Sequence, residues 1–237
     1  MGRGRTKHAE FAMASGEMSS AEYVRFLGVS LNVAASVSRE GALHYVCTDW
    51  RHIAELLAAG KLVYGDTINI AVWVKANAGQ GSFYRSQHEL VGIFRVGQAP
   101  HLNNVELGRH GRSRTNVWHY AGVNSFRAGR MEELRSHPSA KPVALVADAI
   151  KDCTRRGDVV LDTFCGSGTT ILAAERVGRH ARALEIEPRY VDVAIRRWQA
   201  FTRRDARHAE SGLSFDEIAA EGSQAGRPAS KDDGAKP

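Results

Sequence analysis

The chain has 237 residues, of which 43% are hydrophobic and 24% are charged. This length and composition suffice for one sizeable core, and they exclude collagen-like, low-complexity and wholly disordered proteins. The formal net charge of +6 favours a polyanionic partner; the alternative is a soluble basic protein without one.

No targeting or membrane segment is evident in the sequence. No apolar run reaches the roughly 18 residues that a membrane-spanning helix needs, and the basic start of the chain leads into no apolar stretch of a secretory signal. The three cysteines, Cys47, Cys153 and Cys165, lie far apart and form no Cys-x-x-Cys or zinc-type cluster. We therefore expect reduced thiols, no metal, no membrane partner and a cytoplasmic location.

The first half of the chain predicts two helices and three strands. Apolar spacing predicts a helix from a cap at Ser19 or Ser20 to Val37, ended by Gly41, and then a strand over 42–47. Asp49 is predicted to cap a helix through Ile53–Ala58, with Gly60 as its stop. Strands are predicted over 67–74 and 90–96, with a loop over 76–82 between them.

The second half continues the alternation after a polar, basic and irregular stretch over 98–137. A helix opened by Pro142 and ended by Gly157 precedes a strand over 158–162, a helix over 169–177, a strand over 181–186 and a helix from Pro188 to Trp198. This order predicts an α/β fold with a mostly parallel sheet and helices on both faces. We expect one domain over 1–202 and a polar, largely disordered tail over 203–237, in which Ser214 and Glu217 have the spacing of a capping box.

The most informative segment runs from Val159 to Thr170. A buried strand ends in Asp162, and Gly166 and Gly168 then allow a sharp turn and close approach of a ligand. The following helix offers unpaired N–H groups at its start. Glu185, at the end of the next predicted strand, suits the two hydroxyls of an adenosine ribose. An ordinary tight turn is the structural alternative.

Two other nucleotide sites are disfavoured at this turn. A nicotinamide site needs a third glycine where Ile171 stands, and a P-loop needs a Gly-Lys-Ser/Thr sequence that is missing. Asp162 would repel a pyrophosphate, whereas it suits a cationic ligand such as a sulfonium.

Three segments resemble the S-adenosylmethionine-dependent DNA amino-methyltransferases, which modify adenine N6 or cytosine N4. Residues 162–170, Asp-Thr-Phe-Cys-Gly-Ser-Gly-Thr-Thr, resemble their Asp-Pro-Phe-x-Gly-Ser-Gly-Thr-Thr motif I. Residues 137–142 resemble the His-Pro-Thr-x-Lys-Pro segment that precedes motif I in the β-type motif order, and 185–190 resemble Glu-Ile/Leu-Asp-x-x-Tyr. The resemblance covers about residues 8–201 and implies a Rossmann-like methyltransferase fold, S-adenosylmethionine as cofactor and double-stranded DNA as partner. The cofactor residues that it implies are Asp162, Phe164, Gly166, Ser167, Gly168, Thr169, Glu185, Lys141 and Pro142.

The sequence departs from this family in two places. Thr163 replaces the proline of motif I, and no Pro-Pro occurs anywhere in the chain. Family members carry Asp/Asn/Ser-Pro-Pro-aromatic, motif IV, which binds the exocyclic amine and stacks on the flipped base. The resemblance therefore predicts that the catalytic strand and loop lie upstream of Met1. Asp49 and Trp50 are interpreted as a helix cap and a packing ring, not as a substitute. The unfilled place in the sheet predicts a solubility cost or a homodimer that covers the open edge.

The basic segment over 98–136 is the predicted DNA-contact and target-recognition region. Arginine pairs with phosphates or guanine, asparagine can read adenine, and aromatic rings stack on unstacked bases. A solvated basic loop is the alternative. The candidate DNA-binding residues are Arg109, Arg112, Arg114, Asn116 and Trp118. His88 and Glu89 are interpreted as structural or DNA-facing, and Cys165 as a small packing residue.

The resemblance thus implies methylation of an exocyclic amino group in DNA, within a restriction-modification system or a mobile element. Two alternatives stay open. The chain could be an inactive remnant that binds only cofactor or DNA, which the missing motif IV favours, or a methyltransferase acting on another substrate class, which the basic segment disfavours.

Overall fold

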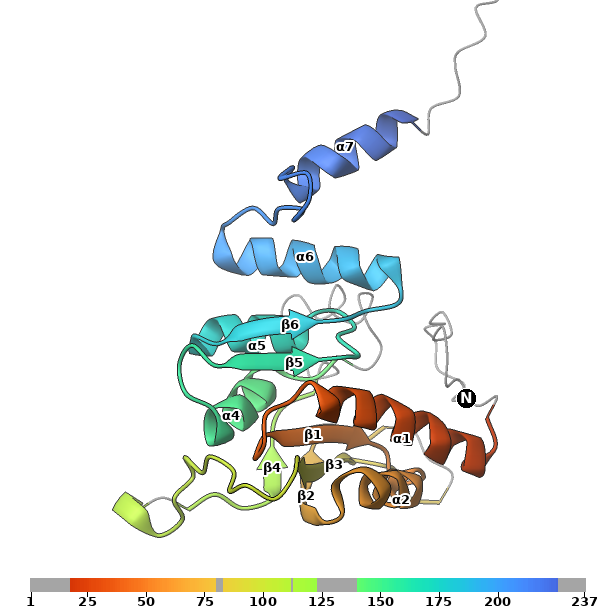
Figure 1. Cartoon of the computed structure of the whole chain (residues 1–237), viewed down its shortest axis with the longest axis vertical. Coiled ribbons are helices and arrows are strands. Elements are labelled where there is room, and N and C mark those ends of the chain that lie inside the picture. The colour runs from red at the N-terminus through yellow and green to blue at the C-terminus, as the bar shows by residue number, and fades with distance from the viewer. Residues whose placement is uncertain (1–17, 80–82, 112, 123–139, 226–237) are drawn as a thin grey trace, which may run out of the picture.

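The computed structural model describes residues 18–79, 83–111, 113–122 and 140–225 (Figure 1). The elements in chain order are α1 (Ser20–Ser36), β1 (Leu43–Thr48), α2 (Ile53–Tyr64), β2 (Thr67–Val74), β3 (His88–Arg95), the 3-10 helix η1 (Arg109–Gly111), β4 (Val117–His119), α4 (Val143–Cys153), β5 (Val159–Asp162), α5 (Thr169–Val177), β6 (His180–Ala183), α6 (Pro188–Thr202) and α7 (Phe215–Ala225).

Every helix and strand predicted between residues 19 and 202 is present. The start of α1 shows why the prediction was reliable there. The Ser19 side chain accepts a hydrogen bond from the Glu22 N–H, and the Glu22 carboxylate accepts one from the Ser19 N–H, which forms a complete capping box.

The predicted end of α2 was wrong. The helix passes through Gly60 and ends at Tyr64, followed by Gly65 with a φ of 82°. Gly60 is needed inside the helix because a Cβ there would lie 2.3 Å from a ring carbon of Phe94, the largest fully buried side chain of the described residues. Asp49 caps the turn before α2, where its carboxylate accepts from the N–H groups of Arg51 and His52.

The strands form a mixed arrangement, so the expectation of a mostly parallel sheet was wrong for the described residues. A four-stranded sheet has the order β1-β3-β2-β4, and a two-stranded sheet pairs β5 with β6. The ladders β1–β3 and β2–β3 are antiparallel, whereas β2–β4 and β5–β6 are parallel. The connection between β2 and β3 contains no helix that could carry the chain back across the sheet in its described residues, so β3 returns as an antiparallel neighbour.

Strand β4 lies in the stretch predicted to be irregular. It is only three residues long, and it is held by its parallel ladder to β2 and by a hydrogen bond from the Val72 N–H to the Asn116 carbonyl. A segment this short has no period of its own, and only its tertiary partner makes it a strand.

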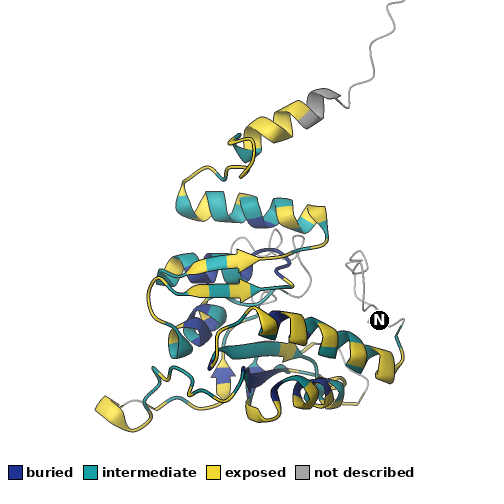
Figure 2. Ribbon diagram, viewed as in Figure 1, coloured by how far each residue is buried: buried dark blue, intermediate teal, exposed yellow. Residues whose placement is uncertain are grey.

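Helices cover both faces of the larger sheet, as predicted. Alternate residues of β3 face opposite ways: Val91 and Ile93 pack with α4, whereas Phe94 packs with α1 and α2. A third cluster joins α4 and α5 to the inner side of β5 and β6. Figure 2 shows these buried stretches between the layers and the exposed outer side of α1. Helix α4 therefore takes part in the cores of both sheets.

Strands β1 and β5 each have an edge with no strand partner among the described residues, as do β4 and β6 at the other end of each sheet. β1 pairs only with β3, and β5 pairs only with β6. Helix α1 and the residues after it reach both ends of β5, through a ring contact of Phe26 with Phe164 and an ion pair of Arg39 with Asp158 at 3.7 Å. Val159 of β5 is 61% exposed, which is unusual for a strand in a parallel ladder.

Part of the predicted tail is ordered. Helix α7 begins after Ser214, whose hydroxyl accepts from the Glu217 N–H, so the helix predicted from the capping-box spacing is confirmed. Arg196 of α6 stacks on the ring of Phe215 and anchors that helix. The prediction of a largely disordered tail was therefore too broad for 203–225, and residues 226–237 lie outside the described part.

The sequence also led to expectations about membrane-spanning helices and cysteines. In the part of the chain that the structure describes, no helix combines the length and the apolar character that crossing a bilayer requires. Cys47, Cys153 and Cys165 are all free thiols.

Candidate cofactor site and nucleic-acid face

The turn between β5 and α5 is built by local hydrogen bonds. The Asp162 carboxylate accepts from the N–H of Phe164 at 3.0 Å, and the Cys165 N–H donates to the carbonyl of Leu184 at 3.0 Å. The turn from β5 is thereby fixed to the end of β6. Asp162 stays partly exposed at the carboxyl end of its strand, where ligands of α/β sheets bind.

Glu185 joins the two strand ends directly. One carboxylate oxygen accepts from the Gly166 N–H at 2.6 Å, and the other accepts from the Glu187 N–H at 3.0 Å. Each oxygen keeps a second lone pair, because a carboxylate can accept about four hydrogen bonds. Glu185 is thus held rigidly and can still accept from two hydroxyls.

Three of the predicted cofactor residues face the protein. Ser167 is 2% exposed, and its hydroxyl and carbonyl both accept from the Arg197 guanidinium of α6. Thr169 is also buried, and a Cβ on Gly168 would lie 2.7 Å from the Cβ of Ala194. These residues give the turn its shape and seat it on α6.

Lys141 and Pro142 lie at the start of α4, near the end of β5. Pro142 is the N-cap residue of α4, and the Lys141 ammonium lies 3.0 Å from a carboxylate oxygen of Glu89. Burial disfavours the charge on Lys141, but the Cys47 sulfur, Glu89 and Asp162 outweigh it and raise the pKa of Lys141 above its usual value. The structure therefore places a lysine and two carboxylates around the end of β5.

Phe164 and Cys165 have opposite environments in the turn. Phe164 is 59% exposed and meets the ring of Phe26 edge-on, with 6.2 Å between ring centroids, which leaves ring surface free for a ligand. Cys165 is buried, and burial, with smaller effects of Asp162 and Glu185, raises its pKa to about 12. A thiol with this pKa stays protonated at neutral pH and is a poor nucleophile.

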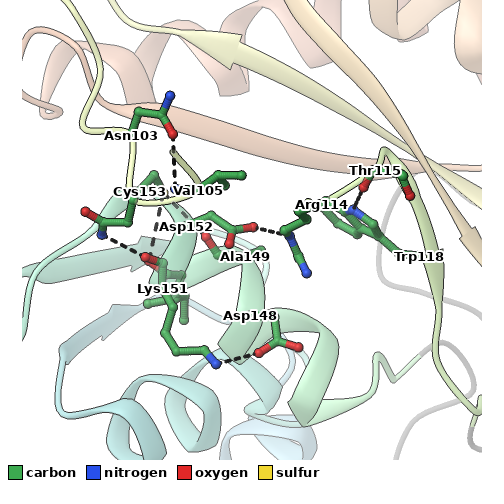
Figure 3. A network of polar contacts seen from close by, with 12 residues as sticks. Asn103, Val105, Arg114, Thr115, Trp118, Asp148, Ala149, Lys151, Asp152 and Cys153 are labelled. Carbon is green, nitrogen blue, oxygen red and sulfur yellow. Dashed lines mark hydrogen bonds and ion pairs between the residues drawn. The ribbon is translucent and has the colours of Figure 1, made fainter. Parts of the chain in front are cut away.

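Two of the predicted DNA-binding residues take part in contacts within the protein: Trp118 is buried and Arg114 is partly buried. Figure 3 shows both in their polar network. Trp118 is 6% exposed, and its indole N–H donates to the Thr115 carbonyl at 3.0 Å. Arg114 stacks over the Trp118 ring and pairs with Asp152 of α4 at 2.7 Å. The expectation that Trp118 stacks on bases therefore fails in this conformation, because its pairing position in β4 points the ring into the core.

The other three candidate DNA-binding residues differ in their surroundings. The Asn116 side chain donates to Asn69 and to the Ile70 carbonyl, so it joins β4 to β2. Arg109 is exposed on η1 and pairs with Glu106, with 3.2 Å between their closest atoms. Arg112 lies outside the described residues.

The sequence interpretation added Tyr84, Arg85 and Ser86 to the DNA-contact face, but it missed two features of this region. Phe83 and Tyr84 are 85% and 82% exposed and pack edge-on, with 4.3 Å between ring centroids. An aromatic pair beside a glycine-rich loop was the available signal. The second feature is the pairing of Glu89 with two lysines, Lys75 at 2.7 Å and Lys141 at 3.0 Å, which no spacing in the sequence reveals.

The whole arrangement fits S-adenosylmethionine. Its methionine part carries an ammonium and a carboxylate, which match Asp162 and Lys141, and its ribose hydroxyls match Glu185. Among the described residues, no group of three or more His, Cys, Asp or Glu side chains is placed to bind a metal ion.

The family model for DNA methylases of the N6/N4 class matches residues 5–196. The chain belongs to this DNA methylase family. Among curated proteins, the Type II methyltransferase M.ScaI of Streptomyces caespitosus is 38% identical over 90 residues, 38% of this chain and 30% of the relative. M2.MboI of Moraxella bovis is 26% identical over 142 residues, 57% of this chain and 50% of the relative. The chain thus spans half or less of the length of these relatives.

Solved structures confirm the fold. A PvuII DNA methyltransferase described as cytosine-N4-specific matches with a TM-score of 0.67 at 18% identity, over 91% of this chain and 81% of that one. The M1.HpyAVI–SAM complex matches with a TM-score of 0.61 at 20% identity, over 76% of this chain and 83% of that one. The predicted Rossmann-like methyltransferase fold is thereby confirmed.

Proposed function

We propose that this chain binds S-adenosylmethionine at the β5–α5 turn and serves the methylation of an exocyclic amino group, adenine N6 or cytosine N4, in double-stranded DNA. The observation that carries the proposal is the joint placement of Asp162, Phe164 and Glu185 at the ends of β5 and β6, with Lys141 beside them. The family membership and the basic charge support DNA as the substrate.

The chain's own residues would hold the cofactor in a fixed orientation. Asp162 would accept from the ammonium of the methionine part, Lys141 would pair with its carboxylate, and Glu185 would accept from the ribose hydroxyls. When bound, the cofactor would supply a methyl group on a sulfonium. Its transfer would form an N–C bond as the S–C bond breaks, leaving a neutral thioether, and the methylated amine would release one proton to solvent. Cys165 takes no part, because it is a buried thiol with a raised pKa.

The sequence of this chain offers no match to the amine-binding loop, motif IV, of the family. Residues 1–237 contain no Pro-Pro sequence, so no Asp/Asn/Ser-Pro-Pro-aromatic loop is present in them. We propose that such a loop, on a strand between β1 and β5, is needed for transfer, because both strands have an edge free of strand partners among the described residues. A homodimer that covers this edge and a cytoplasmic location remain predictions.

The test is methyl transfer from labelled S-adenosylmethionine to double-stranded DNA. We expect no incorporation by the chain alone, although it binds the cofactor. We expect incorporation when a strand-and-loop segment carrying Asp-Pro-Pro-Tyr is fused before residue 1, and nucleoside analysis of the product then identifies N6-methyladenine or N4-methylcytosine. Methylation by the chain alone would refute the need for this loop, and absence of cofactor binding would refute the proposed function.

We propose that Arg109, which is exposed on η1, and Arg112 of the basic segment predicted from the sequence contact DNA phosphates. Replacing both with Gln should weaken DNA binding and reduce the slope of log K against log salt by about 1.8, because each phosphate contact contributes roughly 0.9. Fluorescence anisotropy at several salt concentrations measures both quantities.

The matched control removes two positive charges from helices outside the basic segment. Lys61 of α2 and Arg176 of α5 belong to other elements, and replacing both with Gln should leave the salt slope near its original value. Equal slopes for the two double variants would show that the arginines act only through net charge, and the proposed contacts would be abandoned.

A further inference from the structure

Glu89 lies at the centre of an ion cluster between the larger sheet and the cofactor turn. It is the second residue of β3, and its two carboxylate oxygens contact different lysines: one lies 2.7 Å from the Lys75 ammonium and the other 3.0 Å from the Lys141 ammonium. The exposed fractions of the three side chains are 20% for Glu89, 29% for Lys75 and 21% for Lys141. Such shielding from water makes these pairs stronger than surface ion pairs.

The two lysines belong to different parts of the protein. Lys75 directly follows β2, and its ammonium also lies 4.9 Å from the centre of the Trp73 ring. Lys141 precedes α4, where it interacts with Asp162 at the end of β5. Glu89 therefore ties the Lys141 side chain to the rigid sheet by an ion pair, beside a longer contact of the Lys141 ammonium with the Trp73 ring, 6.0 Å from its centroid.

We propose that Glu89 is a positioning residue for cofactor binding, which holds Lys141 charged and oriented toward the carboxylate of the methionine part. The inference rests on the proposed function. Glu89 acts on the cofactor only through Lys141. Lys75 completes the charge balance of the cluster, and within the described part of the chain its ion pair is with Glu89 and not with the end of β5.

The groups that act on Lys141 come from three strands, and together they raise the pKa of Lys141 against the effect of burial. Glu89 of β3 and Asp162 of β5 are carboxylates, whereas Cys47 of β1 is a free thiol. The lysines in turn hold the pKa of Glu89 below its usual value, although burial opposes this. If Glu89 is replaced with Gln, burial acts on Lys141 with less opposition, so the pKa of Lys141 falls. The variant should then lose Lys141 charge, and cofactor affinity, at a lower pH than the original protein.

The experiment titrates the full chain with S-adenosylmethionine and with 5′-methylthioadenosine, which lacks the amino-acid part, at pH 7.5 and pH 9. For Glu89→Gln we expect affinity for S-adenosylmethionine to fall about tenfold at pH 7.5, as for loss of one charge-assisted contact, and further at pH 9. Affinity for 5′-methylthioadenosine should stay within about twofold, because Lys141 faces only the amino-acid part. A merely structural role would not separate the two ligands.

Lys75→Gln is the matched control, because it removes a charge from the same cluster while Glu89 still pairs with Lys141. Its affinity for both ligands should stay within about twofold of the original. The inference is overturned if Glu89→Gln binds S-adenosylmethionine unchanged at both pH values, if it loses both ligands equally, or if Lys75→Gln has the same effect. If the original chain binds neither ligand, the proposed function fails and the inference fails with it.

Discussion

Replacing Glu185 with Ala is expected to weaken S-adenosylmethionine binding about 100-fold, because two hydrogen bonds to a charged carboxylate contribute roughly 1.5 kcal/mol each. The carboxylate is held by the N–H groups of Gly166 and Glu187, so little orientation is lost when a ribose binds. Isothermal titration calorimetry measures the affinity. Glu185→Gln keeps one acceptor oxygen and should lose less affinity than the Ala variant.

The control for Glu185 lies two residues away. Glu187 is the N-cap of α6, and its side chain pairs with Arg189, whereas its link to Glu185 uses only the backbone N–H. Glu187→Gln should therefore bind the cofactor as the original does. An unchanged affinity in Glu185→Ala, with its thermal unfolding also unchanged, would remove Glu185 from the site.

Replacing Gly168 with Ala is expected to destabilise the fold by about 2–4 kcal/mol. The φ of 82° costs an alanine about 1 kcal/mol, and the new Cβ would lie 2.7 Å from the Cβ of Ala194 and 3.0 Å from its Cα. Overpacking of this kind adds about 1–3 kcal/mol. Urea unfolding followed by circular dichroism measures the loss, and displacement of α6 should also weaken cofactor binding.

Gly157→Ala separates the two contributions. Gly157 has a φ of 83°, but a Cβ added there would meet no described atom within 4 Å, so its substitution should cost only the conformational part, about 1 kcal/mol. Equal losses for the two variants would contradict the steric contact between the turn and α6.

The order of helices and strands could be predicted from the sequence because each has a local signal. Ser19 and Glu22 mark the start of α1, and Thr169 to Val177 follow a glycine turn and end at another glycine. The direction of the strands could not be predicted, because the return of β3 between β1 and β2 depends on tertiary pairing. The place of Gly60 inside α2 could not be predicted for the same reason, because the Phe94 ring that leaves no room for a Cβ there belongs to β3, far along the chain.

The candidate site residues could be predicted where they belong to the motifs at the ends of β5 and β6, but not where their positions depend on partners from distant segments. Asp162, Phe164 and Glu185 lie together because two adjacent parallel strands end at the same edge. Trp118 looked suitable for a base, yet its three-residue strand places it in the core. Glu89 was interpreted from the sequence only as structural or DNA-facing, because its partners, Lys75 and Lys141, come from distant segments.

The central claim is that the β5–α5 turn and the end of β6 bind S-adenosylmethionine. Amide hydrogen exchange of the full chain, with and without saturating cofactor, tests it most directly. We expect slower exchange in peptides covering 163–169 and 184–188, with little change over α2. Unchanged exchange in both of these segments, with protection elsewhere or nowhere, would contradict the claim.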